Sequence, residues 1–163
     1  MAKDKKSDLE ELKKDYIKIQ KKHNLPEFEE LNEDFQIEKT AEIETDFLIR
    51  EVRKLVADKL ASYLRFVETL LNPTNAPMFV FSIIKTLGAD EKKKLSEVYE
   101  KLAKNEIRLI ELDTVFSEKA EAEFIKNSHK LWQQVKKDTL KILKVVEKNL
   151  DNKFETNNKG YFG

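Results

Sequence analysis

Apolar residues recur at helical spacing along most of this chain. Near the start they follow one another at intervals of three, four and three residues, which is one stripe of a helix. The stripe consists of Leu9, Leu12, Tyr16 and Ile19. We expect this helix to begin after Ser7, a favoured N-cap residue, and to end near His23, because Leu25 precedes a proline and is pushed away from helical conformation. A short helix over 27–31 and a connection over 32–37 should follow.

The longest pattern predicts a helix over 40–71. At about 100° per residue its apolar positions fall on one broad face. They are Leu48, Val52, Leu55, Val56, Leu60, Tyr63, Val67 and Leu70. The segment 72–77 contains two prolines and should end the helix.

The segment 77–87 predicts a short helix that is apolar on every side. Its large apolar residues are Met78, Phe79, Val80, Phe81, Ile83, Ile84 and Leu87. A helix of this kind is usually buried, so we expect it at the centre of the fold. Gly88 directly follows and should take the left-handed position that ends a helix.

Two more long helices are predicted, one from Asp90 to a break at 113–117 and one over 118–150. The first has helical phase at Leu95, Val98, Tyr99, Leu102, Leu109, Ile110, Leu112 and Phe116. The second has its inner face at Phe124, Ile125, Leu131, Trp132, Val135, Ile142, Leu143, Val146 and Leu150. Residues 151–163 are polar and rich in Asn, so we expect a fraying tail in which Phe154, Tyr161 and Phe162 could dock.

These elements predict an all-α fold. The 163 residues suit one domain, and three Gly and three Pro are too few for an all-β chain. We therefore expect a single-domain helical bundle over 1–150, with about five to six helices, long antiparallel helices and a short apolar central helix. Residues 151–163 would form a polar C-terminal tail.

Two peptides, at 25–31 (Leu-Pro-Glu-Phe-Glu-Glu-Leu) and 71–79 (Leu-Asn-Pro-Thr-Asn-Ala-Pro-Met-Phe), resemble segments of small all-helical archaeal proteins of unknown function. The resemblance covers about a tenth of the chain. It implies a source, and it carries over no activity, ligand or site residue.

Composition removes several classes of site and partner. The chain has no Cys and two His, so a Cys-ligated zinc site, thiol catalysis and a three-His metal site are excluded within one chain. Acidic and basic residues both number 31, so no net charge draws the protein to nucleic acid or membrane. The longest strongly apolar run, 76–84, is far shorter than a membrane span, and no apolar run follows the basic first residues. We expect a cytoplasmic protein with no membrane partner.

Catalytic motifs are missing from the sequence. The glycines do not form a phosphate-binding loop, and no Glu-x-x-His pair occurs. We expect His23 and His129 to be structural or solvated. No catalytic, cofactor-binding or metal-binding residue is predicted, and no cofactor is expected.

Two carboxylates fall on an apolar stripe. With Leu95 at 0°, Glu106 lies at about +20° and Asp113 at about 0°. A buried carboxylate needs a cation, a donor or a proton, and Arg53 and Lys59 are the bases on or beside the facing apolar stripe. We favour a structural ion pair. Solvated acids near the helix end and a metal or catalytic acid site are the alternatives.

The last helix carries a stripe of one charge. Measured from Ile125, its lysines fall between about 100° and 160°, opposite the apolar face. They are Lys126, Lys130, Lys137, Lys141, Lys144 and Lys148. A solvated outer face is the favoured interpretation, and docking of an acidic partner or a nucleic-acid backbone is the alternative.

An acidic segment offers the counterpart. Residues 27–46 contain nine acids and one base, and the acids nearest its start are Glu27, Glu29, Glu30, Glu33 and Asp34. A solvated linker explains this best. Contact with a basic surface, including the lysine stripe of a neighbouring copy, is the alternative.

The favoured hypothesis for function is a non-enzymatic helical interaction or scaffold protein that binds a protein partner or itself. The alternative is a nucleic-acid-associated protein that uses the lysine stripe. A carboxylate-based metal binder or enzyme around Glu106 and Asp113 ranks third.

Overall fold

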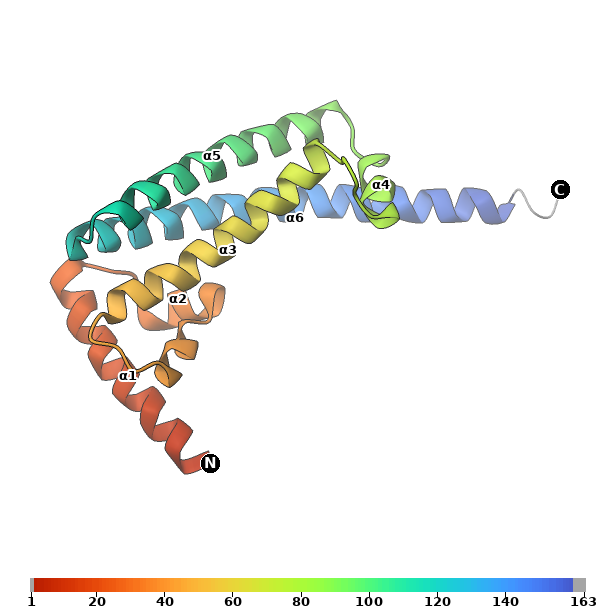
Figure 1. Ribbon diagram of the computed structural model, residues 1–163. Helices are drawn as coiled ribbons and strands as arrows, with labels where there is room; N and C mark the ends of the chain where they lie inside the picture. Colours follow the sequence, from red (N-terminus) through yellow and green to blue (C-terminus); the bar gives the residue numbers. More distant parts are fainter. Residues whose placement is uncertain (1, 160–163) are drawn as a thin grey trace. The chain divides into compact units, whose positions relative to one another are not determined.

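The computed structural model describes residues 2–159, and the regular elements in this part of the chain are all helical. They are α1 (Ala2–His23), α2 (Phe28–Phe35), the 3₁₀-helix η1 (Ile37–Glu42), α3 (Leu48–Leu71), α4 (Met78–Ile84), α5 (Ala89–Thr114) and α6 (Glu118–Lys159), as drawn in Figure 1. The all-α helical bundle expected from the sequence is confirmed, with slightly more helices in the described residues than the five to six expected.

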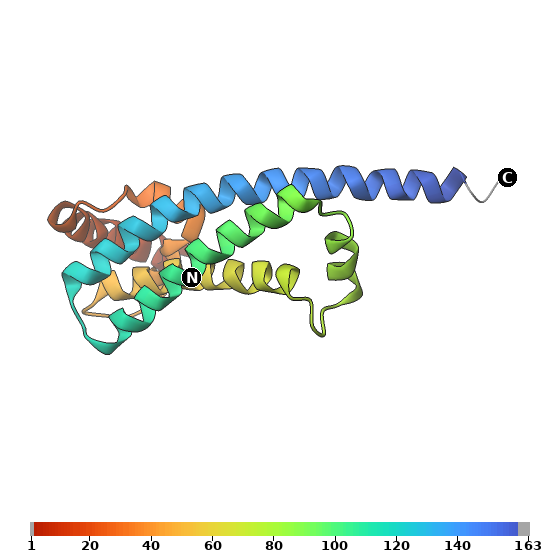
Figure 2. The ribbon, with the colours of Figure 1, turned by 90° about the horizontal axis from the view of Figure 1, so that it is seen from above.

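Contacts along the chain divide it into two compact units. Unit 1 consists of Met1–Ala61 with Lys104–Trp132, and unit 2 consists of Ser62–Ala103 with Gln133–Gly163. The helices α3, α5 and α6, drawn from a second side in Figure 2, each contribute residues to both units. Each unit therefore has its own core on shared helices.

The core of unit 1 is built on α1 and α2 at one end. Tyr16 is fully buried, its hydroxyl donates to the carbonyl of Pro26 at 2.7 Å, and its ring meets Phe28 edge to face at 5.4 Å. Burial raises the pKa of the Tyr16 phenol, and the negative charges of Glu27 and Glu30 raise it further. The phenol is therefore held neutral as a hydrogen-bond donor.

The segment after α1 differs from the sequence prediction. α2 extends to Phe35 where a connection was expected, Gln36 takes a left-handed φ of 55°, and α3 begins at Leu48 instead of residue 40. Burial explains the difference, because Phe35 and Ile37 both insert into the core and the chain must turn between them. α1 also begins earlier than expected, and Ser7 lies inside it.

The core of unit 2 includes one side of α4 only. Val80 and Ile83 of α4 are buried three residues apart, and Leu87, just after the helix, is also buried. Two other apolar side chains of α4 are largely open to solvent, with Met78 82% exposed and Phe79 67% exposed. The expectation that this helix is buried on every side was wrong, because a helix of two turns presents a single side to its core.

The boundaries around α5 and α6 agree in part with the sequence. The break expected at 113–117 is confirmed, since α5 ends at Thr114 and α6 begins at Glu118. Gly88 has no positive φ, so it does not end α4 in the expected way. Its N–H donates to the Glu91 carboxylate at 2.9 Å, a contact at the beginning of α5. The last helix continues past residue 150 to Lys159. The side chain of Phe154, and Tyr161 and Phe162, lie outside the described residues.

Candidate functional site

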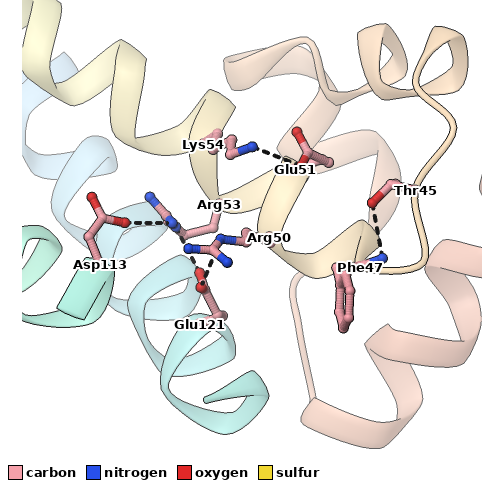
Figure 3. Close-up of polar contacts among 8 residues, drawn as sticks. All are labelled: Thr45, Phe47, Arg50, Glu51, Arg53, Lys54, Asp113 and Glu121. Carbon is pink, nitrogen blue, oxygen red and sulfur yellow. Dashed lines mark hydrogen bonds and ion pairs between the residues drawn. The ribbon is translucent and has the colours of Figure 1, made fainter. Parts of the chain in front are cut away.

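A buried ion-pair network joins three helices within unit 1 (Figure 3). Arg53 of α3 is buried, and its Nε donates to Oε2 of Glu121 on α6 at 2.7 Å. Its Nη2 donates to Oδ1 of Asp113 on α5 at 2.9 Å. One guanidinium therefore holds α5 and α6 against α3 where the α5–α6 connection passes.

The three charged groups of this network have different surroundings. Glu121 is fully buried, whereas the side chain of Asp113 is 53% exposed. Oε1 of Glu121 accepts no hydrogen bond and lies 4.0 Å from Nε of Arg50, one turn before Arg53 on α3. Because a buried carboxylate without a partner is costly, Arg53 is the group that allows Glu121 to be buried.

Only part of the ion pair predicted from the sequence is brought together. Arg53 and Asp113 meet as an ion pair. Glu106 is half-buried, and the Arg53 donors are directed to Asp113 and Glu121. The ammonium group of Lys59 lies over the ring of Trp132, 5.1 Å from its centroid. Arg53 is therefore the residue that links α3 to both α5 and α6.

Sequence reasoning missed Glu121, although the signal was present. From Ile125, at about 100° per residue, Glu121 falls at about −40° and so inside the apolar face of α6. Its chain neighbours Ala122, Phe124 and Ile125 are all buried. An acid at the centre of an apolar face requires a buried cation, and Arg53 supplies it.

A second polar contact ties α1 to the beginning of α6, also in unit 1. Lys22 Nζ donates to Oε2 of Glu118 at 2.9 Å, and His23 Nε2 lies 2.8 Å from Oε1 of the same carboxylate. The hydrogen bond from Lys22, and then that from His23, hold the pKa of Glu118 below its ordinary value. The ring of His129 packs edge-on against Phe35 at 6.4 Å. His129 thus takes part in packing, and His23 in a polar contact with Glu118.

A groove of about 740 Å³ runs between α5 and α6 in unit 1. Its floor is apolar and includes Leu112, Ala120 and Phe124. Leu112 and Phe124 also pack with Ala57 of α3 in a buried cluster. Four charged residues of both signs line the groove: Arg108, Glu111, Lys119 and Glu123.

The lysine stripe is divided between the two units. Lys137, Lys141, Lys144 and Lys148 are exposed and belong to unit 2. Lys130 is exposed and Lys126 half-buried, and both belong to unit 1. Lys126 Nζ pairs with Glu123 at 2.5 Å, so an acid one turn before the stripe neutralises its first lysine.

The acidic segment lies on the surface of unit 1. Its first acids, Glu27, Glu29, Glu30 and Glu33, are exposed, and Asp34 is half-buried. Glu29 accepts a hydrogen bond from Lys13 of α1 at 2.9 Å. One acid of the segment therefore pairs with α1 of the same unit, and most of the other first acids face solvent.

Neither a metal cluster nor a membrane span is found in the described part of the chain. Among the residues whose side chains the structure describes, no group of three or more His, Asp or Glu could hold a metal ion, and no described helix is long and apolar enough to cross a bilayer. Comparison with known proteins returns no match: no protein family, no curated protein and no solved structure is significantly similar to this chain.

Proposed function

We propose that this protein is a cytoplasmic, non-enzymatic helical module that acts by binding another protein through its surface. The observation that carries the proposal is the number of large apolar side chains left in solvent within each unit. In unit 1 they are Ile17, Ile43, Phe47, Ile107, Ile110, Val115 and Phe116; in unit 2 they are Met78, Phe79, Phe81, Leu140 and Leu143.

Grouping is what gives these residues significance, since single exposed apolar residues are normal on any protein. Met78, Phe79 and Phe81 lie within four positions of one another on α4, and Leu140 and Leu143 lie on one side of α6. Burying one such side chain fully contributes about 1.5–3 kcal/mol, so a partner that covers a few of them gains useful affinity.

The charged groups of the two polar contacts described above pair with one another. Arg53 spends its donors on Glu121 and Asp113, and Glu118 is held by Lys22 and His23. These contacts hold helices together. Exposed apolar groups such as Met78, Phe79 and Leu143 take no part in these polar contacts, which supports a binding function over a catalytic one.

Site-specific photo-crosslinking in extract of the native source tests this proposal. A photoreactive phenylalanine analogue would replace Phe79 in one variant and Leu143 in another, with replacement at exposed Lys92 as the matched control. We expect adducts with a second polypeptide from the apolar positions and none from position 92. Absence of adducts at both apolar positions would contradict a protein-binding function.

One observation favours a second candidate, binding to nucleic acid. Lys137, Lys141, Lys144 and Lys148 form an exposed basic row on α6, and such a row can follow a phosphate backbone. Binding through it would fall steeply with salt, and this dependence separates the two candidates.

A further inference from the structure

We propose that the partner of α6 in unit 2 is a second copy of this chain, which docks residues 43–47 of its own unit 1. This inference rests on the proposed function and names the partner. The two surfaces are the leucine–lysine face, defined as Leu140 and Leu143 with Lys137, Lys141, Lys144 and Lys148, and the acidic link, defined as residues 43–47.

On the leucine–lysine face, two exposed leucines lie beside a row of lysines that follows one side of them. Leu140 is 53% exposed and Leu143 is 41% exposed. Three residues apart on a helix, they lie on one side and about 4.5 Å apart along the axis. Exposed Lys141 and Lys144 each directly follow one of these leucines, and Glu147 lies one turn beyond Leu143. A nucleic-acid backbone would use the lysines and leave the leucines in water, so the face fits a protein better.

The acidic link has the complementary composition. It joins η1 to α3 without helical structure, and it exposes Ile43 (45%) and Phe47 (55%). Glu44 and Asp46 lie between them and are exposed. Ile43 is in extended conformation, and Oγ1 of Thr45 accepts a hydrogen bond from the N–H of Phe47 at 3.0 Å (Figure 3). The link therefore presents two apolar groups and two acids on a locally fixed backbone.

The opposite net charges of the two units support contact between unlike units of different copies. Unit 1 contains 22 acidic and 18 basic residues, a net −4, whereas unit 2 contains 13 basic and 9 acidic residues, a net +4. Pairing unit 2 with the unit 1 of another copy brings opposite charges together, and pairing like units would oppose this. The zero net charge of the chain conceals this polarity.

A contact of this kind joins two different surfaces of the same chain. Two copies can dock reciprocally and close as a dimer, or each copy can dock on the next and form a larger ring or an open chain. The expected species are thus dimers or larger assemblies at high protein concentration, and salt should dissociate them because part of the contact is charged.

Light scattering against protein concentration, at low and high salt, tests the proposal. Lys141→Glu with Lys144→Glu, and separately Glu44→Lys with Asp46→Lys, should each give monomers. Combining all four changes reverses both surfaces and should restore assembly. Lys92→Glu with Lys93→Glu makes the same charge change at exposed positions elsewhere in unit 2 and should leave assembly intact. Circular dichroism melts show that each variant is folded.

Disulfide trapping identifies the contact itself, because the natural chain has no Cys. Chains carrying Ile43→Cys are mixed with chains carrying Leu143→Cys under mild oxidation. We expect mixed dimers to form faster than between Ile43→Cys and Lys92→Cys chains, and equal rates would overturn the proposed contact.

The remaining outcomes separate this inference from the proposed function. A protein that stays monomeric at every concentration, while position 143 crosslinks to a foreign polypeptide, overturns the second-copy partner and leaves the binding function standing. Assembly that persists in each double variant made alone also overturns it, since another surface must then be responsible. Monomers without crosslinks at position 79 or 143 would remove both proposals.

Discussion

Arg53 and Glu121 form a buried ion pair across 68 residues of sequence, with 2.7 Å between Nε and Oε2. Replacing Glu121 alone leaves the guanidinium partly unpaired inside unit 1. We expect Glu121→Leu to cost about 3–5 kcal/mol in the free energy of unfolding, measured by urea denaturation.

The double variant Arg53→Met with Glu121→Leu should be more stable than Glu121→Leu alone, because it removes both charges together. Asp113→Asn is the control. The Asp113 side chain is 53% exposed, so its removal should cost less than about 1 kcal/mol. If the double variant is as unstable as Glu121→Leu alone, the unpaired charge of Arg53 is not the cause of the loss.

Acid should weaken the contact between α1 and α6. Lys22 and His23 lower the pKa of Glu118 in the folded protein from its ordinary 4.5. The unfolded chain therefore binds the proton more tightly than the folded chain, so this stabilisation is present above pH 4.5 and is lost as pH falls through the lower, folded value. Melting temperature against pH for Glu118→Gln should show a shallower acid decline than the natural chain. Identical declines would contradict this contribution.

Substitutions on α4 should separate its buried side from its exposed side. Ile83→Ala removes buried methyl groups and should cost about 2–5 kcal/mol. Phe81 is 38% exposed, so Phe81→Ala should cost less than the roughly 3–5 kcal/mol of a fully buried phenylalanine. Phe79→Ser should leave the melting temperature almost unchanged. Equal losses of stability at positions 79 and 83 would mean that both sides are covered.

The lysine row gives the test of nucleic-acid binding. We expect no duplex to bind more tightly than about 10 μM at physiological salt, which is within ordinary non-specific affinity. Fluorescence anisotropy against salt measures this, with a log–log slope of about −0.9 for each phosphate neutralised. Sub-micromolar binding that Lys137→Glu with Lys144→Glu abolishes, at unchanged melting temperature, would favour the nucleic-acid candidate instead.

Local spacing was enough to predict the helical class and several helix ends. The α1 end at His23, the α3 end at Leu71 and the break between Thr114 and Glu118 all follow from proline, capping residues and apolar periodicity. The turn at Gln36 was not predictable in this way. It depends on Phe35 and Ile37 both reaching the core, which is a property of the tertiary fold.

The candidate sites show the same division. Arg53 and Asp113 were found because each lies on an apolar stripe, and the pair forms as an ion pair. The exposed side of α4 could not be predicted, since periodicity does not distinguish a short apolar helix covered on all sides from one covered on a single side. Glu121 could have been predicted from the sequence, because the same helical spacing places it on the apolar face of α6.

Tyr16 gives the protein an internal optical reporter. Its hydroxyl is sealed between α1 and the carbonyl of Pro26, and burial raises its pKa above that of a tyrosine in water. Phenolate from this ring therefore forms at a higher pH while α1 and α2 stay together than it does once they separate. Its rate of appearance after a pH jump measures how often this corner opens, independently of global unfolding.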